Sequence, residues 1–197
     1  MQCIGLTGGI AAGKSEVGKI LVSQGIPVLD TDKVAHEVME PGTTVYEQVV
    51  REFGEEILET SGEINRSKLG RLVFSDPASL LRLNAIVHPE VGRRWRAWVR
   101  DQKIQAKGPL VVVAIPLLFE CGLEKEFDGV LCVWAPEELM KTRLYNRGLD
   151  DKQAKLRIQS QWPVDQKAQH STWILKNDRD LNHLHAQVKD WLRRFNL

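Results

Sequence analysis

The hydrophobic positions along this chain alternate between short continuous apolar runs and longer stretches with helical spacing. Continuous runs of this length are typical of parallel strands that are buried on both faces of a sheet. They occupy residues 3–7, 26–29, 110–115, 129–134 and 172–175. The intervening segments place apolar residues three or four positions apart, as amphipathic helices do. The pattern therefore predicts an α/β protein with a five-stranded parallel sheet flanked by helices.

The stretch from 43 to 107 reads as consecutive helices with little strand character. A block of this size between two strands exceeds an ordinary crossover connection. We expect one domain over 1–197, with a core of 1–40 and 108–197 and a helical, substrate-holding insertion over 41–107. A long helical stretch should begin at Asp76-Pro77 and be interrupted at His88-Pro89, because proline lacks the N–H that a helix needs.

Composition narrows the classes of partner. The formal charge is +1 and the isoelectric point is near 7.7, so no global field attracts nucleic acid or an anionic membrane. Apolar runs fall short of the roughly 20 residues that span a bilayer, and the first strand begins almost at Met1. We expect a cytosolic monomer. Cys3, Cys121 and Cys132 lie in or beside apolar runs, which predicts buried, reduced thiols.

The first strand leads directly into Gly8-Gly9-Ile10-Ala11-Ala12-Gly13-Lys14-Ser15. This is the G-x-x-x-x-G-K-[ST] phosphate-binding motif, in which glycines allow successive backbone N–H groups to face an anion. A helix beginning near Lys14 would point its positive end at the same place. Lys14 is expected to reach the β- and γ-phosphates of a nucleoside triphosphate, and the Ser15 hydroxyl to help hold Mg²⁺.

The second strand ends in Asp30-Thr31-Asp32, at the sheet edge where parallel strands line a ligand crevice. One carboxylate can accept a proton from a substrate hydroxyl, and the other can orient a metal-bound water or a substrate group. A cap on the following helix is the alternative explanation for Asp32, and the functional role is favoured over it. The strand at 110–115 has no terminal acid, so Asp32 is the first candidate for a metal carboxylate and Glu120 a weaker one.

Arginines supply candidate phosphate contacts in two places. Arg143 and Arg147 are four residues apart on an expected helix that Gly148 ends, and therefore share a face. Arginines in a lid over about 140–165 would neutralise charge on a transferred phosphoryl group, although a solvent-exposed pair explains the spacing as well. Arg66, after a turn containing Gly62, is a candidate for a phosphate of a second substrate.

Taken together, these motifs resemble the dephospho-coenzyme A kinase family over nearly the whole chain. The matching segments are 5–15, 30–32, 64–66, 86–89, 116–120 and 157–161, with Lys167, Ile174 and Asn177. The resemblance implies a P-loop kinase fold with an acceptor-binding insertion and a lid. It also implies transfer of the ATP γ-phosphoryl group to the ribose 3′-hydroxyl of dephospho-coenzyme A, with Mg²⁺ as cofactor.

The resemblance assigns roles residue by residue. Asp32 is implied as general base and metal ligand, Ser15 as the other metal ligand, and Lys14 and Arg143 as catalytic cations. The implied ATP-binding residues are Gly8, Gly9, Ile10, Ala11, Ala12, Gly13, Lys14, Ser15, Glu16, Arg147 and Asn177. The implied acceptor-binding residues are Asp30, Arg66, His88 and Leu117.

Three segments depart from the family pattern: Ala11-Ala12 replaces Gly-Ser, Thr31 replaces Ala, and Ser171-Thr172-Trp173 differs from the usual residues before the last strand. From the residues alone, a kinase for a nucleoside monophosphate or another small alcohol fits equally well. A GTPase-like switch is disfavoured, because the chain has no Asp-x-x-Gly and Asp178 replaces the lysine of the guanine motif.

Overall fold

The computed structural model describes residues 1–105 and 108–197. These residues form two compact units, one comprising Met1–Asp30 and Val99–Leu197 and the other Thr31–Trp98. The sequence places the helical insertion at 41–107, so its expected end at residue 107 lies outside the described part of the chain. Each unit is described below by itself.

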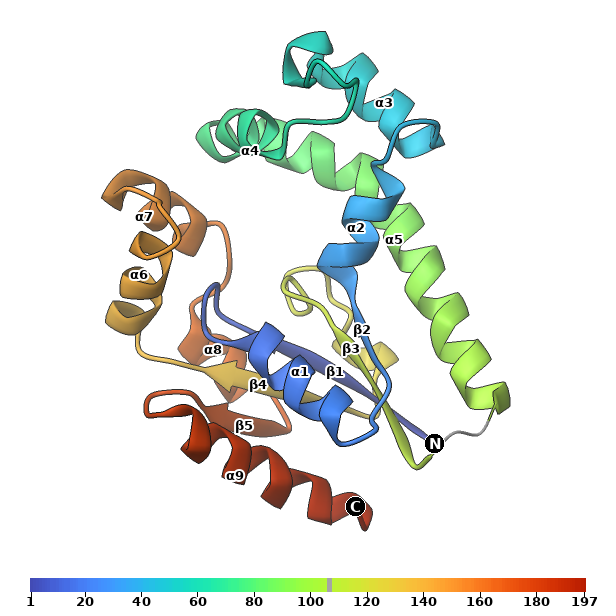
Figure 1. Ribbon diagram of the computed structural model, residues 1–197, viewed down its shortest axis with the longest axis vertical. Coiled ribbons are helices and arrows are strands. Elements are labelled where there is room, and N and C mark those ends of the chain that lie inside the picture. Colours follow the sequence, from blue (N-terminus) through green and yellow to red (C-terminus); the bar gives the residue numbers. More distant parts are fainter. Residues whose placement is uncertain (106–107) are drawn as a thin grey trace. The chain divides into compact units, whose positions relative to one another are not determined.

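The first unit contains a five-stranded sheet in the order β2-β3-β1-β4-β5 (Figure 1). The strands are β1 (Gln2–Gly8), β2 (Val28–Asp30), β3 (Leu110–Ala114), β4 (Gly129–Trp134) and β5 (Trp173–Lys176). All neighbouring strands pair in parallel. The predicted five-stranded parallel sheet is therefore confirmed, and the carboxyl ends of its strands lie at a common edge.

The helices of this unit follow the strands as connections. They are α1 (Lys14–Ser23), α6 (Glu137–Tyr145), α7 (Asp151–Gln159), α8 (Val164–Gln169) and α9 (Leu181–Leu192), with short 3-10 turns at Glu124–Glu126 and Arg193–Phe195. The α1 helix begins at Lys14, as predicted, and Gly25 in a left-handed conformation (φ 77°) follows its end. A residue with a Cβ rarely adopts that conformation, which is why glycine ends the helix here.

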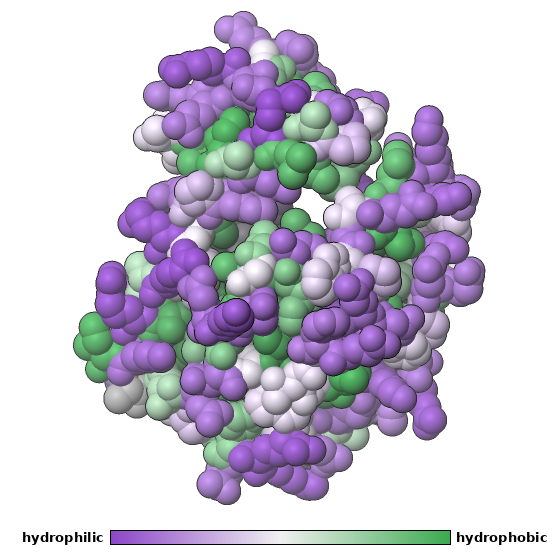
Figure 2. Space-filling model, turned by 180° about the vertical axis from the view of Figure 1, so that it is seen from behind, coloured by the Kyte–Doolittle hydropathy of each residue, from purple (hydrophilic) through white to green (hydrophobic). Residues whose placement is uncertain are grey.

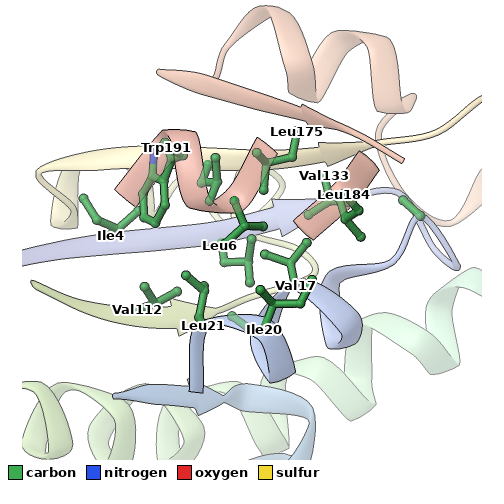
Figure 3. Packing of buried hydrophobic residues seen from close by; sticks show 14 of the residues in the cluster. Ile4, Leu6, Val17, Ile20, Leu21, Val112, Val133, Leu175, Leu184 and Trp191 are labelled. Carbon is green, nitrogen blue, oxygen red and sulfur yellow. The ribbon is translucent and has the colours of Figure 1, made fainter. Parts of the chain in front are cut away.

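The core packs α1 and α9 against one face of the sheet (Figure 3). Alternate residues of β1, Ile4 and Leu6, point to this face and are completely buried, as the two-residue period of a strand requires. Each such residue removes enough apolar surface from water to contribute about 1.5–3 kcal/mol. Buried side chains come from both helices: Val17, Ile20 and Leu21 of α1, and Leu184, Val188, Trp191 and Leu192 of α9.

The opposite face of the sheet is covered by α8 and by the loop after β3. The α8 helix contacts β1 and β4, and Leu118 of the loop lies against Gly5 of β1. A Cβ added at Gly5 would stand 2.5 Å from the Leu118 side chain, too close for any real contact. Strand β1 is consequently covered on both faces, which explains its continuous apolar sequence.

The second unit is helical. It contains α2 (Thr31–Val38), α3 (Thr44–Phe53), a 3-10 turn (Glu55–Ile57), α4 (Arg66–Ser75) and most of α5 (Pro77–Gln105). Thr43 and Asn65 cap α3 and α4, because their side chains accept hydrogen bonds from the first helical turn. Val45, Val49 and Phe53 share the buried face of α3, as their helical spacing predicts.

The α5 helix corrects one prediction. It continues through Pro89 to Gln105 without the interruption expected at His88-Pro89. Proline removes the bond to the carbonyl four residues earlier, here Ala85. Ala85 and Pro89 are both exposed, so water can hydrate that carbonyl and the helix tolerates the proline.

Polar residues cover most of the surface face shown in Figure 2, with hydrophobic residues scattered among them. Lysine and arginine total 27 and aspartate and glutamate 26, which leaves little net charge to attract polyanions. No helix in the described ranges is long and apolar enough to cross a membrane.

The cysteines correct a second prediction in part. All three are free thiols, but Cys121 is exposed, whereas Cys3 and Cys132 are buried. Burial raises the pKa of the Cys3 and Cys132 thiols to about 11, because a thiolate is poorly solvated in the core. Cys121 lies in the loop beyond β3, where no strand holds it inside the sheet.

We predict that native protein at pH 8 reacts with Ellman's reagent faster at the exposed Cys121 than at Cys3 or Cys132, and at all three thiols after denaturation. Partial burial and the nearby Glu120 raise the pKa of Cys121 too, so its reaction should still be slower than in the denatured protein. A pKa near 11 leaves only about a thousandth of the buried thiols ionised at this pH. The released chromophore counts the reacting thiols. Cys121→Ser should abolish the fast reaction, and three fast thiols in native protein would contradict the burial of the other two.

Candidate nucleotide site

The phosphate loop joins β1 to α1, and at two of its positions, Gly8 and Gly13, there is no room for a side chain. Gly8 (φ 146°) and Gly13 (φ 114°) have positive φ. A Cβ on Gly8 would collide with the Val133 carbonyl, and a Cβ on Gly13 with the Asn177 side-chain amide. Both glycines are therefore needed for the close approach of neighbouring strand ends as well as for the turn.

The N-terminus of α1 lacks a side-chain cap. Gly13 occupies the cap position and has no side chain that could accept a hydrogen bond from the helix. By contrast, the helices α3, α4, α7 and α9 are capped by the side chains of Thr43, Asn65, Asp150 and Asp180. The first N–H groups of a helix need an acceptor, and its positive dipole end favours an anion. The geometry is thus suited to a phosphate group at this end of the helix.

Lys14 folds back over the loop. Its Nζ donates to the carbonyls of Gly8 and Gly9 at 3.2 and 3.3 Å. The ammonium group is therefore already beside the backbone that would surround a phosphate. Ser15, in the first turn of α1, is exposed, and Glu16 pairs with Lys19 at 3.1 Å along the same helix.

Arg143 connects α6 to the phosphate loop. Its Nη1 donates to the carbonyls of Ala11 and Ala12 at 3.1 and 3.2 Å, and its Nη2 donates to the Asn177 carbonyl at 3.2 Å. The buried Asn177 side chain also donates to the Ala12 carbonyl, at 2.7 Å. The structure therefore brings together the phosphate loop, Arg143 and Asn177, which sequence analysis identified as separate candidates.

Arg147 does not share a helical face with Arg143, contrary to the sequence prediction. The α6 helix ends at Tyr145, and a tighter turn follows in which the Arg147 N–H bonds the Leu144 carbonyl at 3.0 Å. Gly148, with φ 84°, completes that turn. Arg147 is still close enough to interact electrostatically with Arg143. Burial lowers the pKa of Arg143, and the positive charge of Arg147 lowers it further.

The candidate acids occupy different positions. Asp30 ends β2, level with Ala114 of β3 and thus at the ligand edge of the sheet. Asp32 is exposed in the first turn of α2 rather than at the cap position before it. Glu120 pairs with Lys167 at 2.7 Å, so its carboxylate already holds a buried cation. Leu117 is half-buried in the same loop as Glu120.

The candidate acceptor residues of the second unit lie on separate helices. Arg66 is the first residue of α4 and His88 lies within α5, and both are exposed. A groove of about 820 Å³ within this unit is lined by α5, by α3 and by the connection from α2 to α3, but not by Arg66 or His88.

Glu90 organises the arginines along that groove. It accepts hydrogen bonds from Arg93 at 2.7 and 2.8 Å and from Arg94 at 3.0 Å. These bonds lower the pKa of Glu90 to about 2. Both arginines are therefore neutralised by an acid on the same helix.

The described residues contain no cluster of three or more histidine, cysteine or acidic side chains suited to a metal ion. Mg²⁺ in nucleotide sites binds through one or two protein oxygens together with substrate phosphates and waters. The exposed Ser15 hydroxyl at the start of α1 has the oxygen chemistry that this ion prefers. The residues present therefore fit a nucleotide-bound Mg²⁺.

Sequence analysis did not predict the backbone conformation of Ala11 or the burial of Lys167. Ala11 has φ 56°, a left-handed conformation unusual for alanine, and its methyl group packs with Leu144 of α6 and Ala154 of α7. Lys167 is completely buried. Its position three residues after Val164 and one before Ala168 puts it on the buried face of α8, a helical-spacing signal that was available in the sequence.

A glycine-rich loop after the central strand of a parallel sheet, ending at an uncapped helix with Lys14 at its start, defines a phosphate-loop α/β protein of the kinase type. A family model described as "Dephospho-CoA kinase" matches residues 2–183. The chain therefore belongs to the dephospho-CoA kinase family.

Individual relatives agree with this membership. A dephospho-CoA kinase of Bacillus licheniformis is 43% identical over 190 residues, covering 96% of this chain and 94% of the relative. The crystal structure of TT1252 from Thermus thermophilus has a TM-score of 0.78 at 39% identity, covering 98% and 97% of the two chains. A dephospho-CoA kinase from Campylobacter jejuni has a TM-score of 0.70 at 25% identity, covering 98% and 96%.

We predict different effects on stability for glycine substitutions at the two loop alanines. Ala11→Gly removes a left-handed strain of about 1 kcal/mol but also a packed methyl of about 0.8 kcal/mol, so stability should change by less than about 0.5 kcal/mol. Ala12→Gly removes a fully buried methyl without relieving a positive φ, and should cost about 1–2 kcal/mol.

Urea denaturation of the two variants measures both changes in the free energy of unfolding. Equal destabilisation by the two substitutions would mean that the left-handed conformation of Ala11 carries no strain in solution.

Proposed function

We propose that this protein is an ATP-dependent kinase that phosphorylates the ribose 3′-hydroxyl of dephospho-coenzyme A, forming coenzyme A and ADP. The observation that carries the proposal is the family match over residues 2–183, on a chain whose phosphate loop has the geometry to hold a nucleotide. The relatives named dephospho-CoA kinase support the choice of acceptor.

In the proposed mechanism, the backbone N–H groups of residues 8–15 and the start of α1 bind the ATP phosphates. Lys14 exchanges its long contacts with the Gly8 and Gly9 carbonyls for phosphate oxygens. That exchange is favourable because a hydrogen bond between an ammonium group and an anion is about twice as strong as one to a neutral carbonyl. Glu16 and Asn177 remain predicted contacts of the nucleotide.

Arg143 is the proposed cation beside the transferred phosphoryl group. Its guanidinium is held by the Ala11, Ala12 and Asn177 carbonyls, so it is oriented before substrate arrives. A pre-oriented charge stabilises a transition state without the cost of reorganisation. Arg147, beyond the end of α6, is proposed to contact the nucleotide and adds positive potential to the same region.

Asp32 is the proposed general base for the 3′-hydroxyl, and Asp30, Arg66, His88 and Leu117 are proposed acceptor contacts. Asp32 and Ser15 are the proposed metal contacts. When bound, Mg²⁺ would neutralise phosphate charge during the transfer. Lid residues 140–165 would exclude water, so that the hydroxyl and not water attacks.

We further propose that the protein acts as a monomer in the cytoplasm, on these two small substrates and without nucleic acid or membrane. Its near-neutral charge supports the absence of nucleic-acid and membrane partners, because small anions must then be bound locally by the loop and by individual arginines.

We predict ADP formation that depends on dephospho-coenzyme A. Purified protein with Mg²⁺-ATP should release ADP with this acceptor, and the product should carry a 3′-phosphate. AMP and a sample without acceptor serve as controls, since both test the competing kinase and hydrolase functions. Turnover with AMP alone, or hydrolysis that no acceptor stimulates, would overturn the proposed acceptor.

We predict that Asp32→Asn lowers kcat by about 10²-fold or more, the usual contribution of a general base. ATP affinity measured without Mg²⁺ should stay within about twofold, because the phosphate loop, Lys14 and the start of α1 bind the phosphates without Asp32 in the mechanism. Steady-state kinetics and nucleotide titration measure the two effects. Asp190→Asn, an exposed acid paired with Arg193 on α9, is the matched control, and unchanged kcat in Asp32→Asn would exclude Asp32 as the base.

A further inference from the structure

The most unusual charge in the first unit is Lys167, whose side chain is completely inaccessible to solvent. Its Nζ lies 2.7 Å from Glu120 Oε1 and donates to the Pro116 carbonyl, also at 2.7 Å. Removing an ammonium group from water costs several kcal/mol unless it is paired and hydrogen-bonded. An apolar side chain would fill this position without that cost, so we looked for a function of the buried lysine.

Glu120 extends the contact to the end of the lid. Its Oε1 also accepts the backbone N–H of Trp162 at 2.8 Å. The Phe119 and Trp162 rings stack with a centroid distance of 6.0 Å and an interplanar angle of 9°, and His170 packs edge-on against both. We call Phe119, Glu120, Trp162, Lys167 and His170 the Lys167 cluster.

The same cluster is tied to the strand that carries the phosphate loop. The Thr7 hydroxyl donates to the Pro116 carbonyl at 3.2 Å, so that carbonyl accepts from both Thr7 and Lys167. Thr7 immediately precedes Gly8, the first glycine of the loop. The Pro116 carbonyl therefore links the loop after β3 to the strand that precedes the phosphate loop. Lys167 of α8 holds the same carbonyl in place.

We propose that Lys167 is a positioning residue for phosphoryl transfer. It touches neither substrate. It fixes the segment Pro116–Glu120, which contains the proposed acceptor contact Leu117, and through Glu120 it fixes Trp162 after α7. The inference rests on the proposed function, and it assigns Lys167 to alignment of the acceptor rather than to nucleotide binding.

The test uses the double variant Lys167→Met with Glu120→Gln. A single substitution would leave one buried charge without its partner, and the variant might unfold for that reason alone. Met preserves the apolar volume of the lysine stem, and Gln retains an oxygen acceptor for the Trp162 N–H. The matched control is Arg193→Gln with Asp190→Asn, which removes an exposed ion pair on α9 and the following turn.

We expect the double variant to remain folded, with ATP affinity within about twofold of the parent. Its kcat/KM for dephospho-coenzyme A should fall by at least about tenfold, mostly through a higher acceptor KM, because small misplacements of a substrate contact have effects of this size. The control variant should retain parental values. A role confined to folding would instead lower the melting temperature while leaving the KM of the folded enzyme unchanged.

Amide hydrogen exchange supplies a readout that needs no acceptor. The N–H groups of Cys121, Gly122 and Leu123 bond to carbonyls of residues 117–119. They should exchange at least about tenfold faster in the double variant, while β1 amides keep their protection. Unchanged exchange or an unchanged acceptor KM in a folded variant overturns the positioning role. If the parent protein does not phosphorylate dephospho-coenzyme A, the proposed function fails, and the exchange result alone then decides whether Lys167 fixes this loop.

Discussion

The close approach of backbone segments around the phosphate loop is the constraint on which the site depends. Gly8 lies against the Val133 carbonyl and Gly13 against the Asn177 amide. The loop therefore packs directly against the end of β4 and the residue that follows β5. Asn177 and Arg143 then bond the carbonyls on the outer side of the turn. With those carbonyls satisfied, the peptide units are oriented by the fold and not by the ligand, which is what electrostatic preorganisation requires.

The two faces of the sheet serve different purposes. On one face, α1 and α9 form an apolar core that holds the start of α1 in place. On the other, hydrogen bonds accompany the apolar packing around α8: Lys167 and Thr7 share the Pro116 carbonyl, and Asp165 accepts from the Trp134 indole at 2.6 Å. Hydrophobic packing is non-directional, whereas hydrogen bonds specify orientation. These hydrogen bonds are thus better suited to setting the positions of the loops after β3 and β4.

The elements that sequence analysis found are those with strong local signals. The strands followed from continuous apolar runs, and the phosphate loop from glycines at fixed spacing. Prediction failed where tertiary context overrides a local rule: exposure lets α5 continue through Pro89, and a tight turn ends α6 before Arg147. The contact of Arg143 with residues 11 and 12 joins positions far apart in the chain, so no local pattern could reveal it. The proposed substrate roles of individual residues remain predictions.

The backbone of Ala11 also restricts how this position can change during evolution. Its positive φ disfavours any side chain, most severely a β-branched one. Its methyl group lies against Leu144 and Ala154 in a small apolar cluster. Asparagine and aspartate tolerate the conformation but would bring polar atoms into that cluster. The motif formally permits any residue here, yet the backbone conformation and the neighbouring side chains favour glycine or alanine, so the fold restricts a formally variable position to the smallest side chains.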